Sequence, residues 1–258
     1  MGLAAARARA LGDGPDGSLA LTWVVAEELA AGRRDLRTLV HRWVERHAAD
    51  PRGVDRETAA ALIHLARHDA PPAAAAGQGS DPLVRCVPVA LAAFDAPRTL
   101  VSATYHIAAL THPDPMVAWS AVAVNVALAR FLQGKRDFVP DLLEALWNNE
   151  VPEPLLAAVR RVPLPVRARP GQPGGPGPAV DDAEAALRLA YHEPLLERGL
   201  RGVSDLGPAA AGRAGLAGAL LGARDGAPAL PADWLALDDR DTLGALAARL
   251  VRVDPVAA

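Results

Sequence analysis

Several residue types are scarce in this chain, and each scarcity excludes a class of structure or of partner. Among its 258 residues there is a single cysteine, Cys86, so an internal disulfide is excluded and a reducing compartment such as the cytoplasm is expected. Aromatic residues make up only 4%, so alanine, leucine and valine dominate the 51% of apolar residues. This composition favours close-packed helices over a β-sandwich. The formal net charge of −3, with Lys135 as the sole lysine, gives no basic field for a nucleic acid partner.

Long uninterrupted hydrophobic runs are also scarce. The N-terminus carries Arg7 and Arg9 without a continuous apolar stretch, so no signal peptide is expected. The best candidate for a membrane span is residues 115–132, which Asn125 and Arg130 interrupt. It is short of the roughly 20 apolar residues that a bilayer requires. We therefore predict a buried core helix there and no membrane partner.

The apolar residues that are present recur mostly at helical spacing. A helix N-capped by Ser18 is expected to end at Gly32, and a second is expected to open at Asp35. The same reasoning predicts further helices over residues 57–68, 82–94, 97–110, 115–132, 137–149, 181–190, 194–201, 207–222 and 241–251.

A Pro/Gly-rich run over residues 163–179 divides this series. Its composition cannot pack a core, so we predict a flexible surface loop. The helices that follow the loop are too few to form an independent hydrophobic core. The sequence therefore predicts one all-α globular domain over residues 1–258, with the loop as an insertion.

Four stretches carry short motifs in a fixed order. They read Gly-Pro-Asp-Gly-Ser-Leu-Ala-Leu at 14–21, Arg-Gly-Val at 52–54 with Thr58, Leu-Val-Arg-Cys-Val-Pro at 83–88 with Thr-His-Pro-Asp-Pro at 111–115, and Leu-Ala-Gly-Ala-Leu-Leu-Gly-Ala at 216–223 with Pro-Ala-Asp-Trp-Leu at 231–235. In that order they resemble the ADP-ribosylglycohydrolase family. The family's counterparts are Thr-Asp-Asp-Thr-Ser-Met-Ala-Leu, Arg-Gly-Ile-Gly-x-x-Thr, Leu-Met-Arg-x-x-Pro with Thr-His-x-x-Pro, and Ile-Ala-Gly-Ala-Leu-x-Gly-Ala with Pro-x-x-Trp-Leu.

The resemblance implies the family's all-α fold and cleavage of a glycosidic bond to ADP-ribose. It also implies a pair of Mg²⁺ ions held by a Thr-Asp-Asp run and an Asp-Thr-Asp-Thr run. The first run corresponds to Gly14, Pro15 and Asp16, and the second to residues 209–212, Ala-Ala-Ala-Gly. Magnesium requires hard oxygen ligands, usually carboxylates, and Asp16 alone cannot hold two ions. We therefore expect the metal pair to be lost and no cofactor to be used.

Three functions remain open at this stage. The first is a pseudoenzyme that binds a nucleotide, an ADP-ribose-like ligand or a protein partner, with Asp16, Ser18, Arg85 and His112 as the remnant cleft. The second is a hydrolase or lyase whose metal-independent acid–base chemistry uses Asp16, Asp114 or Asp205. The third is a helical scaffold subunit.

Overall fold

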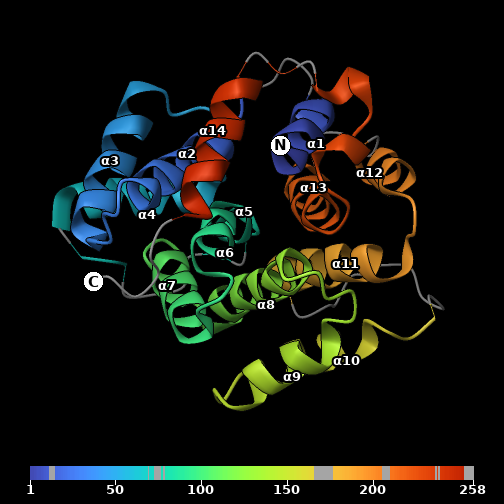
Figure 1. Ribbon diagram of the computed structural model, residues 1–258. Helices are drawn as coiled ribbons and strands as arrows, with labels where there is room; N and C mark the ends of the chain where they lie inside the picture. Colours follow the sequence, from blue (N-terminus) through green and yellow to red (C-terminus); the bar gives the residue numbers. More distant parts are fainter. Residues whose placement is uncertain are drawn as a thin grey trace.

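The computed structural model describes residues 1–11, 15–68, 70–72, 77, 79–165, 177–204, 210–235, 237 and 239–252. Over these residues the chain forms helices and no strand, which confirms the all-α prediction (Figure 1). The helices are α1 (Gly2–Leu11), α2 (Gly17–Ala30), α3 (Leu36–Ala49), α4 (Arg56–His68), α5 (Asp81–Arg85), α6 (Val87–Ala93), α7 (Pro97–Ala109), α8 (Pro115–Leu132), α9 (Val139–Trp147), α10 (Glu153–Arg161), α11 (Pro178–His192), α12 (Leu196–Ser204), α13 (Ala211–Asp225) and α14 (Arg240–Leu250), with 3-10 turns at Ala227–Ala229 and Ala232–Leu235.

Helix α8 lies in the core of the molecule. By length and composition it could cross a membrane, yet 72% of it is buried inside the fold. It packs against α7, α11 and α13, and its bounds are those predicted for a core helix. Its buried residues are mainly alanine and valine, and the small side chains let several helices approach it at once.

Helices α1 and α13 pack with their backbones in close contact. A Cβ atom added to Gly218 would lie 2.2 Å from the carbonyl oxygen of Gly2, and one added to Gly2 would lie 2.1 Å from the carbonyl oxygen of Gly218. Neither position can carry a side chain unless the backbones separate. The small residues of α13 therefore serve close helix packing. Helix α1, their partner, is an element that the sequence pattern did not predict.

Several predicted boundaries are wrong, for local reasons. Asp16 rather than Ser18 caps α2, because its carboxylate accepts from the amide of Leu19 at 2.8 Å. The predicted helix over residues 82–94 is divided at Cys86 into α5 and α6, because Pro88 has no N–H to continue the ladder. Helix α10 was missed, and α11 already begins at Pro178, so residues 178–179 are not loop. Most of the predicted loop, residues 166–176, lies outside the described residues.

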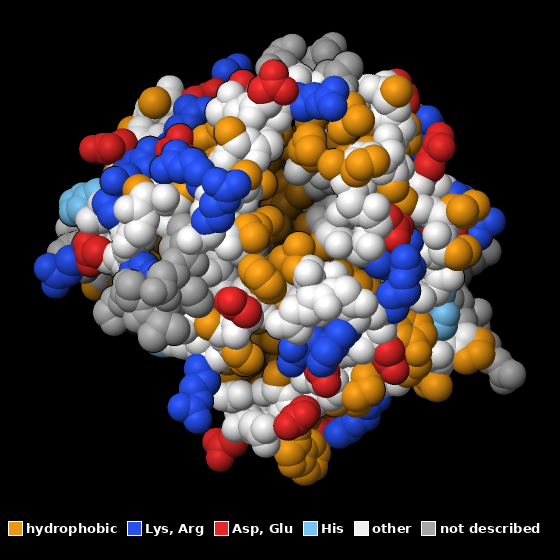
Figure 2. Space-filling model, in the orientation of Figure 1, with side chains coloured by type: hydrophobic (Ala, Val, Ile, Leu, Met, Phe, Trp, Pro, Cys, Tyr) orange, Lys and Arg blue, Asp and Glu red, His pale blue; other side chains and the backbone are white. Residues whose placement is uncertain are grey.

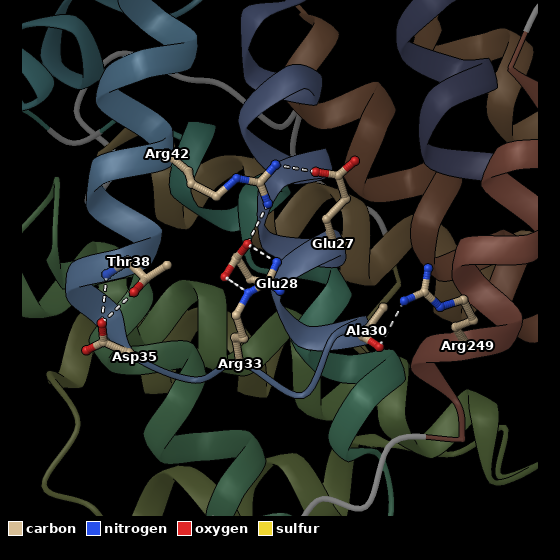
Figure 3. A network of polar contacts seen from close by, with 8 residues as sticks. All are labelled: Glu27, Glu28, Ala30, Arg33, Asp35, Thr38, Arg42 and Arg249. Atoms are coloured by element: carbon tan, nitrogen blue, oxygen red, sulfur yellow. Dashed lines mark hydrogen bonds and ion pairs between the residues drawn. The ribbon is translucent and has the colours of Figure 1, made fainter.

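A buried glutamate joins α2 to α3. Glu28 accepts two hydrogen bonds from Arg33, both at 2.7 Å, and one from Arg42 at 2.5 Å (Figure 3). Arg42 also donates to Glu27 at 2.6 Å. Because its charge is held by two guanidinium groups, the pKa of Glu28 is lowered to about 2, with the hydrogen bond from Arg33 as the largest cause.

Candidate functional site

Two loops are brought together at the N-terminal end of α2. The amide of Ser18 donates to the carbonyl of Gly53 at 3.1 Å, and Gly53 has a φ of +75°. A Cβ on Gly17 would lie 2.3 Å from the carbonyl oxygen of Arg52, so this approach requires glycine. The contact places Asp16, at the end of one loop, on the same side of the molecule as Asp55, which follows the other.

Asp16 is held by an arginine from α1. Arg7 donates from Nε to Oδ2 at 2.7 Å and from Nη2 to Oδ1 at 2.6 Å, a two-point ion pair. The side chains of Arg7 and Asp16 are 4% and 16% exposed. The guanidinium is itself fixed, because its aliphatic stem lies against Gly215 of α13, where a Cβ would come within 2.9 Å of it. Both Asp16 oxygens are therefore engaged by a positive charge of the chain itself.

Helix α13 brings a second arginine–aspartate pair to its first turn. The helix starts at Ala211 without a side-chain cap, and Gly212 follows. The next residue, Arg213, donates to Asp182 of α11, with Nη2 at 2.8 Å from the carboxylate. A Cβ on Gly212 would lie 2.5 Å from the hydroxyl of Ser80. This end of α13 therefore faces the segment that opens α5 and carries no carboxylate at its own first two positions.

A buried hydrogen-bonded chain runs through Arg85, Thr111 and His112. The side chain of Arg85 is fully buried over the ring of Trp43, 4.8 Å from its centroid, and its Nη2 donates to the hydroxyl of Thr111. His112 Nδ1 lies 3.0 Å from the same hydroxyl. Burial, and then the charge of Arg85, lower the pKa of His112 to about 4, so the ring is neutral near pH 7. The predicted pair Arg85 and His112 thus belongs to one cluster.

Two carboxylates of this cluster were not predicted. The amide of Asp55 donates to Asp81 Oδ2 at 3.1 Å, and Asp55 Oδ1 accepts from the amide of Thr58 at 2.5 Å, capping α4. Burial and the charge of Asp55 raise the pKa of Asp81, and the charges of Arg7 and Arg85 oppose that shift. Asp81 is therefore within electrostatic reach of both arginines.

A sequence signal for Asp55 existed. In the segment similar to Arg-Gly-Ile-Gly-x-x-Thr, the second glycine falls at position 55, where this chain has aspartate.

The other predicted site residues have local roles or lie outside the description. Asp114 caps α8 by accepting from the amide of Met116 at 2.8 Å. Ser18 is fully buried; its backbone carbonyl accepts from the hydroxyl of Thr22 at 2.8 Å, and its own hydroxyl has no described partner. Asp205 lies outside the described residues. Asp16 and the Arg85–His112 cluster are therefore the parts of the predicted set that the fold assembles into a polar region.

A groove adjoins the exposed edge of Asp16. Figure 2 shows a hollow lined by hydrophobic side chains between α14 and α1 on one face of the molecule; the groove beside Asp16 is enclosed by residues of α1, α2 and α3 and by the start of α14. It has a volume of about 540 Å³, within the range of small-molecule sites. Trp23, Arg42 and Arg46 line it together with Asp16. Asp16 is therefore part of the groove lining as well as the partner of Arg7.

Known proteins resemble this chain in sequence and in fold. The model of the ADP-ribosylglycohydrolase family matches residues 10–257. The chain belongs to this family. A solved structure titled ADP-ribosylglycohydrolase-related protein complex is similar with a TM-score of 0.80 and 25% identity, covering 97% of this chain and 94% of the other. A search of curated protein sequences finds no match.

The magnesium pair implied by the family does not fit the residues at this site. Asp16, the one acid kept from the first ligand run, has both oxygens bound by Arg7. Ala210, Ala211 and Gly212, the described part of the second run, have no side-chain oxygen. Across the described residues there is no group of three or more His, Cys, Asp or Glu side chains that could hold a metal ion. A divalent ion beside Asp16 would also be repelled by the buried guanidinium.

Proposed function

We propose that this member of the ADP-ribosylglycohydrolase family binds an ADP-ribose-like nucleotide without a magnesium pair and without hydrolysing it. The observation that carries the proposal is the two-point ion pair between Arg7 and Asp16, with oxygens 2.6 and 2.7 Å from the guanidinium. It supplies within the chain the positive charge that the family otherwise takes from metal ions. A fixed arginine stabilises the acid but cannot deliver a metal-activated water.

The remaining polar groups suit recognition of an oxygen-rich ligand. Trp23 offers an aromatic face in the groove, and Arg46 offers an exposed cation near it. Arg85 and His112 are buried, and Arg85 Nη1 and His112 Nε2 have no described hydrogen-bond partner. A buried donor without a partner costs stability unless a ligand or water completes it.

The test measures ligand and metal separately. In buffer with EDTA, ADP-ribose should raise Tm, since a ligand at about 100 times its Kd adds about 2.7 kcal/mol of stability. Mn²⁺ titrated into the metal-free protein and followed by electron paramagnetic resonance should show no tight site. A matched control is Asp95→Asn, an exposed carboxylate change away from the site, which should leave both results unchanged. Two tight Mn²⁺ sites, or metal-dependent release of ADP-ribose from ADP-ribosylated arginine, would overturn the proposal, as would the absence of any shift with ADP-ribose.

A further inference from the structure

A second cavity lies on the face of α2 that points away from the groove described above. It has a volume of about 370 Å³, within the range of small-molecule sites. Val25, Glu28 and Leu29 of α2 line it. Trp23 and Glu27 line the groove, and helical spacing places these two on the opposite side of α2. No described residue lines both cavities, so the second cavity is a separate site.

The wall of the second cavity is aliphatic. Leu39 of α3, Val89 of α6 and Ile107 of α7 line it, and each is at most 5% exposed. Among the described residues no Phe, Tyr or Trp lines it, so it offers no ring for stacking. An alkyl chain placed against such a wall loses its contact with water, which is the main source of apolar binding.

The acids at the edge of this cavity are already engaged. Glu28 and Asp35 are the two carboxylates that line it. Both oxygens of Glu28 accept from Arg33, and one also accepts from Arg42 (Figure 3). Both oxygens of Asp35 accept from the first turn of α3, at the amides of residues 37 and 38 and the hydroxyl of Thr38. The edge is therefore poorly suited to a cationic ligand.

The connection between α2 and α3 supplies positive charge instead. Arg33 and Arg34 both line the cavity. Arg33 uses Nε and Nη2 for Glu28, and its Nη1 takes part in no described hydrogen bond. Its side chain is 53% exposed, so a ligand reaches the guanidinium without displacing the protein. A guanidinium nitrogen only donates, so its natural partner is an anionic acceptor.

The α7 side of the cavity adds hydroxyl groups. Thr99 and Ser102 line it about one helical turn apart, and His106 follows one turn later. His106 Nδ1 lies 2.8 Å from the backbone carbonyl of Ser102, so this nitrogen carries the proton and is used within the helix. The hydroxyls donate to an acceptor as readily as the arginine does, so this edge also accommodates a carboxylate.

We propose that this cavity binds an unbranched aliphatic carboxylate, with the chain against α2, α3, α6 and α7 and the carboxylate at Arg33. Such a ligand is apolar along its length and carries one negative charge at its end, so it matches both the wall and the edge. A volume of about 370 Å³ suits a single short chain rather than a two-chain membrane lipid. The inference goes beyond the proposed function and does not depend on it.

The experiment is isothermal titration of the full chain at pH 7 with sodium octanoate, sodium hexanoate and 1-octanol. Octanoate should bind one to one and about 10- to 20-fold more tightly than hexanoate, because each buried methylene contributes about fourfold. 1-Octanol has the same chain without the charge and should bind about 3- to 10-fold more weakly than octanoate. An excess of ADP-ribose should not displace octanoate, because the two cavities have separate linings.

A filling variant locates the binding site. Ala103 of α7 lines the cavity, so Ala103→Leu places three further carbon atoms inside it and should abolish octanoate binding. The matched control is Ala66→Leu, which adds the same atoms at an exposed position of α4 and should bind octanoate as the unmodified chain does. Thr99→Leu, on the same wall, replaces Ala103→Leu if far-ultraviolet circular dichroism shows that the latter does not fold.

A charge variant tests the carboxylate end. Arg33→Gln leaves Arg42 on Glu28 and should lower the affinity for octanoate to that for 1-octanol, with the affinity for 1-octanol unchanged. Its control is Arg198→Gln, which removes an exposed arginine of α12 and should change neither affinity.

Three results would contradict the inference: octanoate binding that survives Ala103→Leu, equal affinities of the unmodified chain for octanoate and 1-octanol, or displacement of octanoate by ADP-ribose. Attachment to phosphatidylglycerol vesicles without binding of free octanoate would assign the cavity to a membrane lipid and would also refute it. The proposed function is decided separately, by ADP-ribose and Mn²⁺, so either idea can fail while the other stands.

Discussion

Arg7 holds Asp16 through two hydrogen bonds of 2.6 and 2.7 Å, so the one acid kept from the first metal-binding motif is paired with a cation of the same chain. The pair also joins three elements, because Arg7 comes from α1, Asp16 caps α2 and the arginine stem packs on Gly215 of α13. A guanidinium binds a carboxylate at two points and cannot be removed by a chelator. We therefore expect the integrity of this polar centre to be independent of metal concentration.

Replacing Arg7 by methionine should destabilise the protein by about 3 kcal/mol, because it leaves a largely buried carboxylate without its partner. Urea unfolding at pH 7 measures this change. The control is Arg198→Met, which removes a two-point pair to Glu193 whose arginine side chain is 66% exposed. That change should cost much less than Arg7→Met, because solvent screens an exposed ion pair. If the two variants lose the same free energy of unfolding, burial of the Arg7–Asp16 pair does not contribute to stability.

Glu28→Gln should cost roughly 2 to 3 kcal/mol near pH 7, because the pKa of Glu28 is lowered to about 2 in the folded chain from 4.5 in the unfolded one. A lowered carboxyl pKa stabilises the folded state above the unfolded value, and that contribution is lost as pH falls toward 2. The difference between the two proteins should therefore shrink below about pH 4.5.

Denaturant titrations at several pH values between 7 and 2.5 measure the Glu28 contribution. Glu153→Gln, whose carboxylate is 68% exposed in its pair with Arg160, is the control and should show little difference at any pH. A stability difference for Glu28→Gln that stays constant down to pH 2.5 would contradict the assignment.

Gly218→Ala and Gly202→Ala should have opposite signs. The first places a methyl 2.2 Å from the carbonyl oxygen of Gly2, so α1 and α13 must separate, at about 1 to 3 kcal/mol. The second adds a methyl in open space on α12 and should stabilise by roughly 0.5 to 1 kcal/mol through helix propensity. Thermal unfolding of both variants tests the pair, and a neutral Gly218→Ala would mean that the two helices do not pack this closely.

Cys86 should be inert in the folded protein. Its thiol is fully buried, and burial raises its pKa to about 12, so almost no thiolate forms at pH 8. Labelling by a thiol reagent should be more than about 1,000-fold slower than in urea-unfolded protein, since the thiol reacts only after opening. Because the chain has one cysteine, the labelling rate reports that opening directly. Rapid labelling under native conditions would show that α6 opens locally.

The sequence by itself determined the fold class, the family and several helix starts. Asp35 caps α3 as predicted, because a cap depends only on neighbouring residues. Asp114, put forward from the sequence as a candidate acid or base, caps α8. The erased second ligand run is also readable from the sequence, since no side chain at residues 209–212 carries an oxygen. The role of Asp16 was harder to predict: it caps α2 in place of Ser18, and its partner Arg7 belongs to a helix that the pattern did not indicate.

Only the tertiary structure decided what surrounds the kept residues. Asp55 and His112 are 57 positions apart in the chain. The residues around each of them give no indication that both lie beside Gly79. Their proximity depends on the glycine-mediated contact between two loops and on the buried chain through Arg85 and Thr111. Pairings of this kind are set by packing between distant segments, which a linear pattern of residue types does not encode. The sequence therefore revealed which acids had been lost, and the fold revealed which charges and donors stand in their place.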